Sequence, residues 1–329
     1  MKLENSKVFV TGAGGFIGSH LCSELVNLGA SVTAMLHYNS RSDWSNLEFL
    51  PEEVKNDIKV VKGNVEDSSF MDSATKDQNI IFHLAALIGI PYSYEAPLSY
   101  VRTNIEGTIN VLESGRKNDT ELIINTSTSE VYGTALYTPI NEIHPKQAQS
   151  PYSATKISAD NLAESYFNSF ELPVITVRPF NTFGPRQSAR AVIPTIISQL
   201  IKNDKLKLGE LGAVRDFTYV DDTVRGFLKC VEHDNNLGEV FNLGYGKAAT
   251  IEETAKIIMK LMNIDKPIVS DHQRIRPKDS EVFELISDNS KALNLIDWEP
   301  KVDFSSGLQM TIDFVEKNLD FYKTNSYNI

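Results

Sequence analysis

The first half of the chain alternates short apolar segments with longer segments of mixed polarity. Several of the short segments are continuous runs of Val, Ile and Phe, which are typical of strands buried on both faces of a parallel sheet. The longer segments between them are predicted to be helices. The predicted strands are residues 7–11, 31–36, 59–62, 79–84, 121–126 and 174–178, and the predicted helices include residues 17–28, 104–116 and 152–170.

This alternation predicts an α/β fold with a doubly wound parallel sheet over residues 1–178. After about Phe180 the segments become shorter, and proline and glycine become more frequent. We expect residues 179–329 to form a smaller mixed α/β lobe, with the chain re-crossing between the two lobes. Helices are predicted in this part over residues 192–202, 220–233, 251–262 and 305–317.

Composition and charge narrow the class of protein. The 329 residues are 41% hydrophobic and 23% charged, which is ordinary for a globular chain that buries a large core. The chain has 32 Lys and Arg residues against 43 Asp and Glu residues, for a formal net charge of −11. This balance argues against nucleic acid or an anionic membrane surface as a partner, but it leaves room for a local basic pocket.

The sequence gives no sign of a metal site or a membrane segment. Cys22 and Cys230 form neither a disulfide framework nor a metal-ligand spacing. The six histidines match no metal motif, so we predict no metal. The N-terminus lacks a hydrophobic signal region, and the longest apolar stretch, residues 80–90, is too short to cross a bilayer. We therefore expect a cytoplasmic protein without a membrane partner.

A glycine-rich turn joins the first predicted strand to the first predicted helix. Gly12, Gly15 and Gly18 give the spacing G-x-x-G-x-x-G, whereas the strict G-x-G-x-x-G spacing fails because position 17 is isoleucine. Glycines allow a tight turn, and the N–H groups at the start of a helix can then face a pyrophosphate. This arrangement predicts a dinucleotide-binding Rossmann domain.

The end of the second predicted strand bears on which dinucleotide binds. An acidic residue often stands there to bind the adenosine ribose, but this chain has Leu36, followed by Ser40 and Arg41. A hydroxyl and a guanidinium suit a 2′-phosphate better than a free hydroxyl. We therefore favour NADP, with NAD as the alternative.

A second motif, Tyr152-x-x-x-Lys156, opens a predicted helix after Ser150-Pro151. Residues four apart lie on one helix face, and a lysine beside a phenol is expected to lower the pKa of the phenol. Tyr152 could then act as a general base towards a hydroxyl while a hydride leaves the same carbon. Lys156 could also hold the nicotinamide ribose.

Together these motifs resemble the extended short-chain dehydrogenase/reductases, and more narrowly the nucleotide-sugar epimerase and dehydratase group. The resemblance spans residues 6–317. It rests on the three glycines, on His83-Leu-Ala-Ala86, on Tyr152 with Lys156, and on the segments 178–186 and 215–221.

The resemblance implies that residues 1–178 hold the cofactor, bound tightly and regenerated each turnover, and that residues 179–329 hold a nucleotide-activated sugar. It also implies a homodimer formed through the helices near 104–116 and 152–170. The candidate substrate residues are Asn181, Arg186, Val192, Arg215 and Arg276. The candidate cofactor residues are Gly12, Gly15, Phe16, Ile17, Gly18, Ser40, Arg41, Asn64, Val65, Leu84, Ala85, Ala86, Thr126, Tyr152, Lys156 and Pro179.

The residues Thr128-Ser129-Glu130 bear on the reaction. Epimerases of this group usually carry small residues where Glu130 stands, whereas sugar 4,6-dehydratases carry Thr-Asp-Glu or Thr-Ser-Glu. A carboxylate beside an oxidised ring can remove the proton next to the new ketone. The resemblance implies that Thr128 assists Tyr152 and that Glu130 acts at C5. Either Ser129 or Glu130 would protonate the departing C6 hydroxyl.

Three further segments, 36–41, 88–94 and 187–194, resemble the N-acetylglucosamine nucleotide 4,6-dehydratases of legionaminic acid biosynthesis. We therefore expect a lyase that acts on GDP- or UDP-N-acetylglucosamine. UDP-glucuronate decarboxylases share Ser-Thr-Ser-Glu-Val-Tyr-Gly, so a decarboxylase or a 4-epimerase is an alternative. A non-catalytic nucleotide-binding protein on the same fold is a further alternative, which the complete set of Thr128, Glu130, Tyr152 and Lys156 argues against.

Overall fold

The computed structural model describes residues 1–40 and 42–322. Its largest element is a parallel sheet of seven strands in the order β10-β6-β5-β4-β1-β2-β3. The predicted doubly wound parallel sheet is therefore confirmed. The strands are β1 (Lys7–Thr11), β2 (Ser31–His37), β3 (Ile58–Gly63), β4 (Ile80–His83), β5 (Leu122–Thr126), β6 (Val174–Pro179) and β10 (Val240–Leu243).

Helices cover both faces of this sheet, as the continuous apolar strands require. Val8 and Val10 of β1 are buried in one cluster with side chains of α1 (Phe16–Asn27) and α9 (Val220–Glu232). Phe9, between them, is buried in a second cluster on the other face. That second face is covered by α3 (Ser68–Ala74), α6 (Gly107–Lys117) and α7 (Pro151–Phe170).

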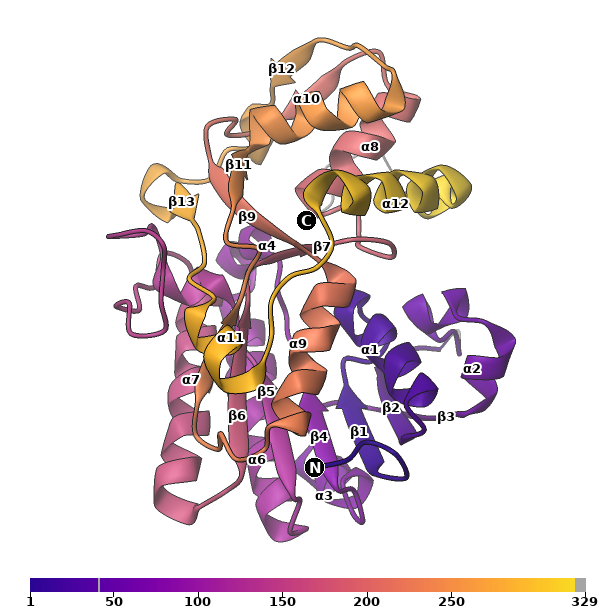
Figure 1. Cartoon of the computed structure of the whole chain (residues 1–329), viewed down its shortest axis with the longest axis vertical. Helices are drawn as coiled ribbons and strands as arrows, with labels where there is room; N and C mark the ends of the chain where they lie inside the picture. The colour runs from indigo at the N-terminus through magenta and orange to yellow at the C-terminus, as the bar shows by residue number, and fades with distance from the viewer. Residues whose placement is uncertain (41, 323–329) are drawn as a thin grey trace.

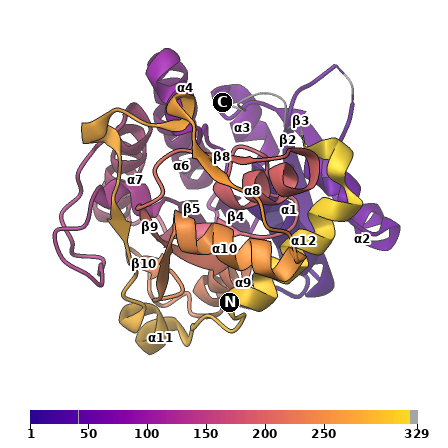
Figure 2. The same cartoon turned by 90° about the horizontal axis from the view of Figure 1, so that it is seen from above.

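The smaller lobe lies at the top of Figure 1, and Figure 2 looks onto it from above. Its larger sheet contains β7 (Asn181–Phe183), β9 (Val214–Tyr219), β11 (Ala248–Thr250) and β13 (Glu284–Leu285), and β8 (Leu206–Leu208) pairs with β12 (Ile268–Ser270). Its main helices are α8 (Val192–Lys202), α10 (Ile251–Met262) and α12 (Phe304–Lys317). The remaining α-helices of the described residues are α2 (Glu52–Asn56), α4 (Ile90–Glu95), α5 (Pro97–Tyr100) and α11 (Ser290–Ile296).

Strand β10 shows where the chain re-crosses. It comes after β9 in the sequence, yet it pairs in parallel with β6 at the edge of the large sheet. The sequence analysis missed β10 because the strand is short and contains a polar residue, Asn242. That side chain accepts a hydrogen bond from the Tyr132 hydroxyl (2.7 Å) and donates one to the Ile140 carbonyl (3.1 Å), so its burial is compensated.

The helix predicted over residues 104–116 differs at its start. The structure has a π-helical segment at Val101–Glu106, which continues directly into α6. This segment is offset from regular helical spacing, so its side chains reach different neighbours from those expected in an α-helix. One of them, Asn104, enters the candidate site described below.

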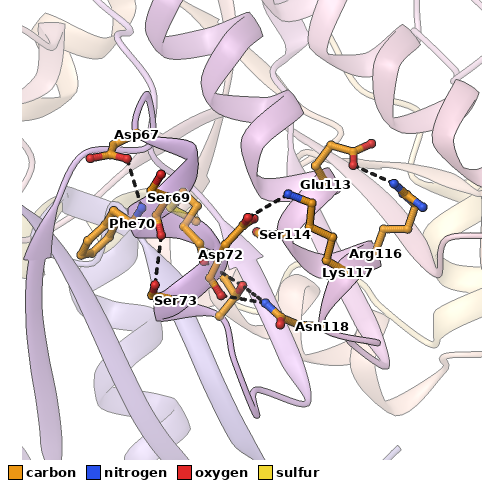
Figure 3. A network of polar contacts seen from close by, with 12 residues as sticks. Asp67, Ser69, Phe70, Asp72, Ser73, Glu113, Ser114, Arg116, Lys117 and Asn118 are labelled. Carbon is orange, nitrogen blue, oxygen red and sulfur yellow. Dashed lines mark hydrogen bonds and ion pairs between the residues drawn. The ribbon is translucent and has the colours of Figure 1, made fainter.

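A polar network fixes the end of α6 against α3 (Figure 3). The Lys117 ammonium lies 2.8 Å from the Asp72 carboxylate. The Asn118 amide donates to the Asp72 carbonyl and to the Thr75 hydroxyl, both at 2.9 Å. Asp67 accepts a hydrogen bond from the Phe70 N–H (3.1 Å) and so caps the start of α3. The contacts of Lys117 and Asn118 with Asp72 and Thr75 thus connect the last turns of α3 and α6.

Candidate functional site

The glycine-rich turn is as tight as the sequence predicts. Gly12 has φ +68°, and a Cβ added to it would lie 2.8 Å from the backbone of Leu84 and Ala85. A Cβ at Gly18 would lie 2.3 Å from the Gly12 carbonyl oxygen. Glycine is therefore required at both positions.

The start of α1 offers backbone donors to an anion. The residue before the helix is Gly15, which supplies no side-chain cap, and Phe16, Ile17 and Gly18 follow as the first helical residues. Their N–H groups have no earlier turn to bond to. A dinucleotide pyrophosphate fits these donors and the close approach that the glycines allow.

A buried threonine–histidine–threonine network fixes the end of β4 beside this turn. The Thr108 hydroxyl donates to the Asn104 carbonyl (2.7 Å), so it accepts from His83 Nε2 at 3.1 Å. His83 Nδ1 then accepts from the Thr11 hydroxyl (2.9 Å). Burial, assisted by the charge of Lys156, lowers the pKa of His83 to about 3. The imidazole is therefore neutral, with its proton on Nε2.

The same network positions two of the predicted cofactor residues. The oxygen of Thr11 accepts the N–H groups of Leu84 and Ala85, both at 3.1 Å. Ala86 follows at once, and the carboxyl ends of β1 and β4 thus form one rigid edge next to Gly12. The sequence analysis assigned no role to Thr11 or His83. The His83-Leu-Ala-Ala86 segment was the feature of the sequence that could have indicated a role for His83.

The remaining predicted cofactor residues lie at the ends of neighbouring strands. Asn64 follows β3 and accepts the Glu66 N–H (3.2 Å), while Val65 is buried against Gly107, where an added Cβ would come within 2.8 Å. Thr126 ends β5 and Pro179 ends β6. Ser40 is exposed in a turn after β2, and Arg41 lies outside the described residues. The preference for NADP therefore stays a prediction.

Tyr152 and Lys156 lie on the first turns of α7. The helix begins at Pro151, and Ser150 and Ser153 form a reciprocal capping box at its start. Both functional side chains are buried, with 6% and 4% of Tyr152 and Lys156 exposed. The Lys156 ammonium donates to the Thr126 carbonyl (2.7 Å), which places it beneath the end of β5.

The pKa values differ from the sequence expectation. Burial lowers the pKa of Lys156 to about 8, with Asp160 acting in the opposite direction. Burial raises the pKa of Tyr152, a hydrogen bond with Thr128 lowers it, and the charge of Glu130 raises it. Lys156 was expected to lower the pKa of Tyr152, but in this structure desolvation is the largest influence on the phenol and the Lys156 ammonium bonds to the backbone.

Thr128, Ser129 and Glu130 come shortly after β5, separated from it by Ser127, and their short segment packs against α7. Thr128 caps a short 3₁₀ helix, Ser129–Tyr132, by accepting the Glu130 N–H (3.2 Å). Ser129 is buried and Glu130 is half-buried. The charge of Glu130 raises the pKa of Tyr152 and also acts on Arg215, so the carboxylate lies within electrostatic reach of both groups. The structure brings Thr128, Glu130 and Tyr152 together.

Asn104 connects this group with the cofactor edge. Its amide bonds both ways with the Leu87 backbone, accepting the N–H (2.9 Å) and donating to the carbonyl (3.0 Å). It also donates to the Thr155 hydroxyl (3.0 Å), next to Lys156 on α7. Sequence analysis missed Asn104, because only the π-helical segment turns it towards both partners.

Two of the predicted substrate residues meet in the smaller lobe. The Arg215 guanidinium on β9 donates to the Glu281 carboxylate (3.1 Å), and Arg276 Nη1 lies 3.8 Å from the same oxygen. Among the described residues, Arg276 Nη1 and the Asn181 amide nitrogen are buried without a hydrogen-bond partner. Buried donors of this kind are suited to the oxygens of a nucleotide diphosphate. Glu281 was not predicted.

Arg186 and Val192 have different surroundings from Arg215 and Arg276. The Arg186 guanidinium donates to the Ser19 hydroxyl (3.2 Å) and to His20 Nδ1 (2.9 Å), both on α1. Its predicted role in substrate binding stays a prediction. Burial lowers the pKa of Arg186 to about 10, so the group keeps its charge at neutral pH. Val192 is the first residue of α8.

The described residues contain neither a metal-ligand cluster nor a membrane-spanning helix. Over residues 1–40 and 42–322 there is no group of three or more His, Cys, Asp and Glu side chains placed to hold a metal ion. Within the same residues, no helix combines the length and the apolar character needed to cross a bilayer.

The chain is similar to known enzymes over nearly its whole length. The family model described as GDP-mannose 4,6 dehydratase matches residues 9–311. The human protein dTDP-D-glucose 4,6-dehydratase is 28% identical over 96% of this chain and 92% of its own. UDP-N-acetyl-alpha-D-glucosaminuronate decarboxylase from Bacillus cytotoxicus is 30% identical over 94% of this chain and 97% of its own.

A solved structure shows the same fold with ligands. It is a UDP-glucuronic acid 4-epimerase variant from Bacillus cereus, in complex with a fluorinated UDP-glucuronic acid and NAD. The two chains superpose with a TM-score of 0.87 and 28% identity, over 95% of this chain and 99% of the other. Three reactions, dehydration, decarboxylation and epimerisation, are thus represented among the similar proteins by their names.

Proposed function

Because the chain belongs to the GDP-mannose 4,6-dehydratase family of nucleotide-sugar enzymes, we propose that it is a nucleotide-sugar 4,6-dehydratase. Its substrate in this proposal is GDP- or UDP-N-acetylglucosamine, and its product is the 4-keto-6-deoxy sugar. The N-acetylglucosamine dehydratases of legionaminic acid biosynthesis are the subfamily that its segments 36–41, 88–94 and 187–194 resemble. The observation that supports the proposal is that Thr128, Ser129 and Glu130 open a short 3₁₀ helix packed against α7, the helix of Tyr152, with Thr128 accepting the Glu130 N–H and Glu130 half-buried.

The cofactor that suits this site is a nicotinamide dinucleotide. The backbone donors at the start of α1 would hold its pyrophosphate, and the edge formed by Leu84 and Ala85 would border it. When bound, this group accepts a hydride from C4 of the sugar and later returns it to C6. NADP remains our preference over NAD, on the basis of Ser40 and Arg41.

Tyr152 and Thr128 would begin the reaction at the C4 hydroxyl. Tyr152 takes the hydroxyl proton as the hydride leaves, which gives a ketone at C4. The Thr128 hydrogen bond favours the phenolate. Lys156, one turn later on the same helix, would hold the nicotinamide ribose. The new carbonyl then acidifies the hydrogen on C5.

Glu130 would carry out the elimination. Its carboxylate removes the C5 proton, and the C6 hydroxyl leaves as water after it receives a proton from Glu130 or through Ser129. Serine is a weak acid, so Glu130 is the stronger candidate for both transfers. Return of the hydride to C6 and of a proton to C5 completes the 4-keto-6-deoxy product, with no net oxidation.

Replacing the acid tests this role. We expect Glu130→Gln to retain cofactor and nucleotide-sugar binding but to form dehydrated product at least about a hundredfold more slowly, because proton transfer by a positioned side chain is worth that much or more. The measurement is product formation under single-turnover conditions. Glu121→Gln, on the exposed residue that precedes the same strand, is the matched control and should turn over normally. Full activity in Glu130→Gln would contradict the assignment.

The decarboxylase is the second candidate. It is supported by the Ser-Thr-Ser-Glu-Val-Tyr-Gly segment at residues 127–133 and by the similarity to the Bacillus cytotoxicus protein. In that reaction the C4 ketone would labilise the carboxylate on C5, which would leave as carbon dioxide, and the resulting enolate would take up a proton at C5. A 4-epimerase needs neither step, so the product itself, with one water lost, carbon dioxide lost or no change of mass, separates the three reactions.

A further inference from the structure

A set of contacts between the two lobes encloses the start of α1. Asn46 lies in a short 3₁₀ helix, Ser45–Phe49, that follows β2. Its N–H donates to the Gly14 carbonyl (3.2 Å), and its side-chain amide donates to the Arg186 carbonyl (3.2 Å). Asn46 is 9% exposed, so both bonds are shielded from water. One residue thus joins the glycine-rich turn to the segment that leads into α8.

Arg186 provides the second part of these contacts. Its backbone has φ +69°, a conformation that non-glycine residues rarely adopt. The guanidinium reaches across to Ser19 and His20 on the second turn of α1. His20 Nδ1 accepts from Arg186, so Nε2 carries the proton and donates to the Pro185 carbonyl (3.0 Å). Arg186 is thereby held to the helix that begins at the glycine-rich turn.

Charges and burial around Arg186 determine the protonation states of Arg186 and His20, the two partners in this contact. Burial and the Arg186 charge lower the pKa of His20, while Asp221, whose carboxylate lies 3.5 Å from His20 Nδ1, raises it. Asp221 also favours the charged form of Arg186. At neutral pH a guanidinium cation therefore bonds a neutral imidazole, and its charge lies close to the first turn of α1.

Residues near the end of the described chain pack against the segments that contain Asn46 and Arg186. The Phe49 ring packs edge-on against Phe314 and Phe321, with centroids 5.3 and 5.5 Å apart. The buried Tyr322 hydroxyl donates to the Gln187 carbonyl (3.1 Å), one residue after Arg186. Both segments that meet at Asn46 are thus held in place by residues far away in the sequence.

We propose that Asn46 and Arg186 form a clasp that retains the nicotinamide dinucleotide throughout the catalytic cycle. In this proposal the segment at Asn46 has to separate from Gly14 and from Arg186 before a dinucleotide lying on the glycine-rich turn can leave. The inference rests on the proposed function, because a hydride that returns to the same sugar requires the reduced cofactor to stay bound until dehydration is complete. Arg186 acts in this proposal as a positioning residue, through its contacts with Asn46, Ser19 and His20.

The test measures cofactor release in the absence of any sugar. Purified protein is loaded with the reduced dinucleotide, and its dissociation is followed by the loss of nicotinamide fluorescence on dilution. We expect Asn46→Ala and Arg186→Gln each to release the cofactor about five- to tenfold faster than the unmodified protein, as loss of one or two hydrogen bonds implies. Melting midpoints measured in parallel report any change in stability.

Asn118→Ala is the matched control, because Asn118 also joins two segments through its side-chain amide but lies at the α3–α6 contact (Figure 3). It should release cofactor at the unmodified rate even if its melting midpoint falls. If Asn46→Ala and Arg186→Gln release the cofactor at the rate of the control, the proposal is wrong. The two residues would then only stabilise the fold. If Arg186→Gln fails to fold, Asn46→Ala decides the question. Since no sugar is present, the outcome does not depend on which reaction the enzyme catalyses.

Discussion

At the scale of single residues, motifs predicted which side chains meet but not how their protonation is set. Thr128, Glu130 and Tyr152 lie near one another, as the family resemblance implied. The pKa of Tyr152, however, depends on how completely the phenol is desolvated, and a sequence contains no measure of burial at one atom. Asn104 and His83 were missed because their partners, Leu87 with Thr155 and Thr11 with Thr108, come from distant parts of the chain.

The buried lysine gives a pH-dependent prediction. Burial lowers the pKa of Lys156 from 10.5 to about 8, so between these values the folded protein binds fewer protons than the unfolded chain. The free energy of unfolding should therefore rise with pH across this window through Lys156. Lys156→Met should lose turnover, and its free energy of unfolding should lack the rise with pH that Lys156 contributes. Denaturant unfolding of the variant and of the unmodified protein at several pH values measures this difference. Parallel pH profiles for the two proteins would contradict the prediction.

At the scale of elements, continuous apolar runs predicted six of the strands in the large sheet with nearly correct ends. The exception was β10, whose Asn242 is tolerated only because Tyr132 and Ile140 satisfy it. The π-helical segment before α6 was also beyond prediction, because its spacing depends on packing against α7 and not on local propensity. Elements fixed by their own pattern were predictable, and elements fixed by distant partners were not.

A buried ion pair connects the helix of the catalytic residues to the sheet. The Arg178 guanidinium of β6 bonds Asp160 of α7 at 3.0 Å and 2.9 Å, and donates to the Tyr132 hydroxyl at 2.8 Å. Asp160→Asn should lower the free energy of unfolding by about 3–5 kcal/mol, because it leaves a buried cation without its counter-ion. Chemical denaturation measures this loss.

The surface pair in Figure 3 is the comparison for that variant. Asp72 and Lys117 form an ion pair of similar length, but both side chains are substantially exposed. Asp72→Asn should therefore change the free energy of unfolding by less than about 1 kcal/mol. Equal losses in Asp160→Asn and Asp72→Asn would show that burial of the Arg178–Asp160 pair has no special weight.

At the scale of the whole molecule, the two lobes meet at the carboxyl ends of the parallel strands. Residues beyond 179 return to the large sheet as β10 and α9, so sequence position alone does not divide the lobes cleanly. The contacts of Asn46 with Arg186 and of Phe49 with Phe314 and Phe321 join the same two parts from the side of α1. A homodimer through the region of α6 and α7 stays a prediction from the resemblance.

The most direct test of the central claim is the mass of the sugar product. Purified protein is incubated separately with UDP-N-acetylglucosamine, GDP-N-acetylglucosamine and UDP-glucuronate, and the nucleotide sugars are analysed by mass spectrometry. The account predicts that one N-acetylglucosamine nucleotide loses the mass of one water, without net reduction of the cofactor. Loss of carbon dioxide from UDP-glucuronate, or no change of mass with any of the three, would contradict it.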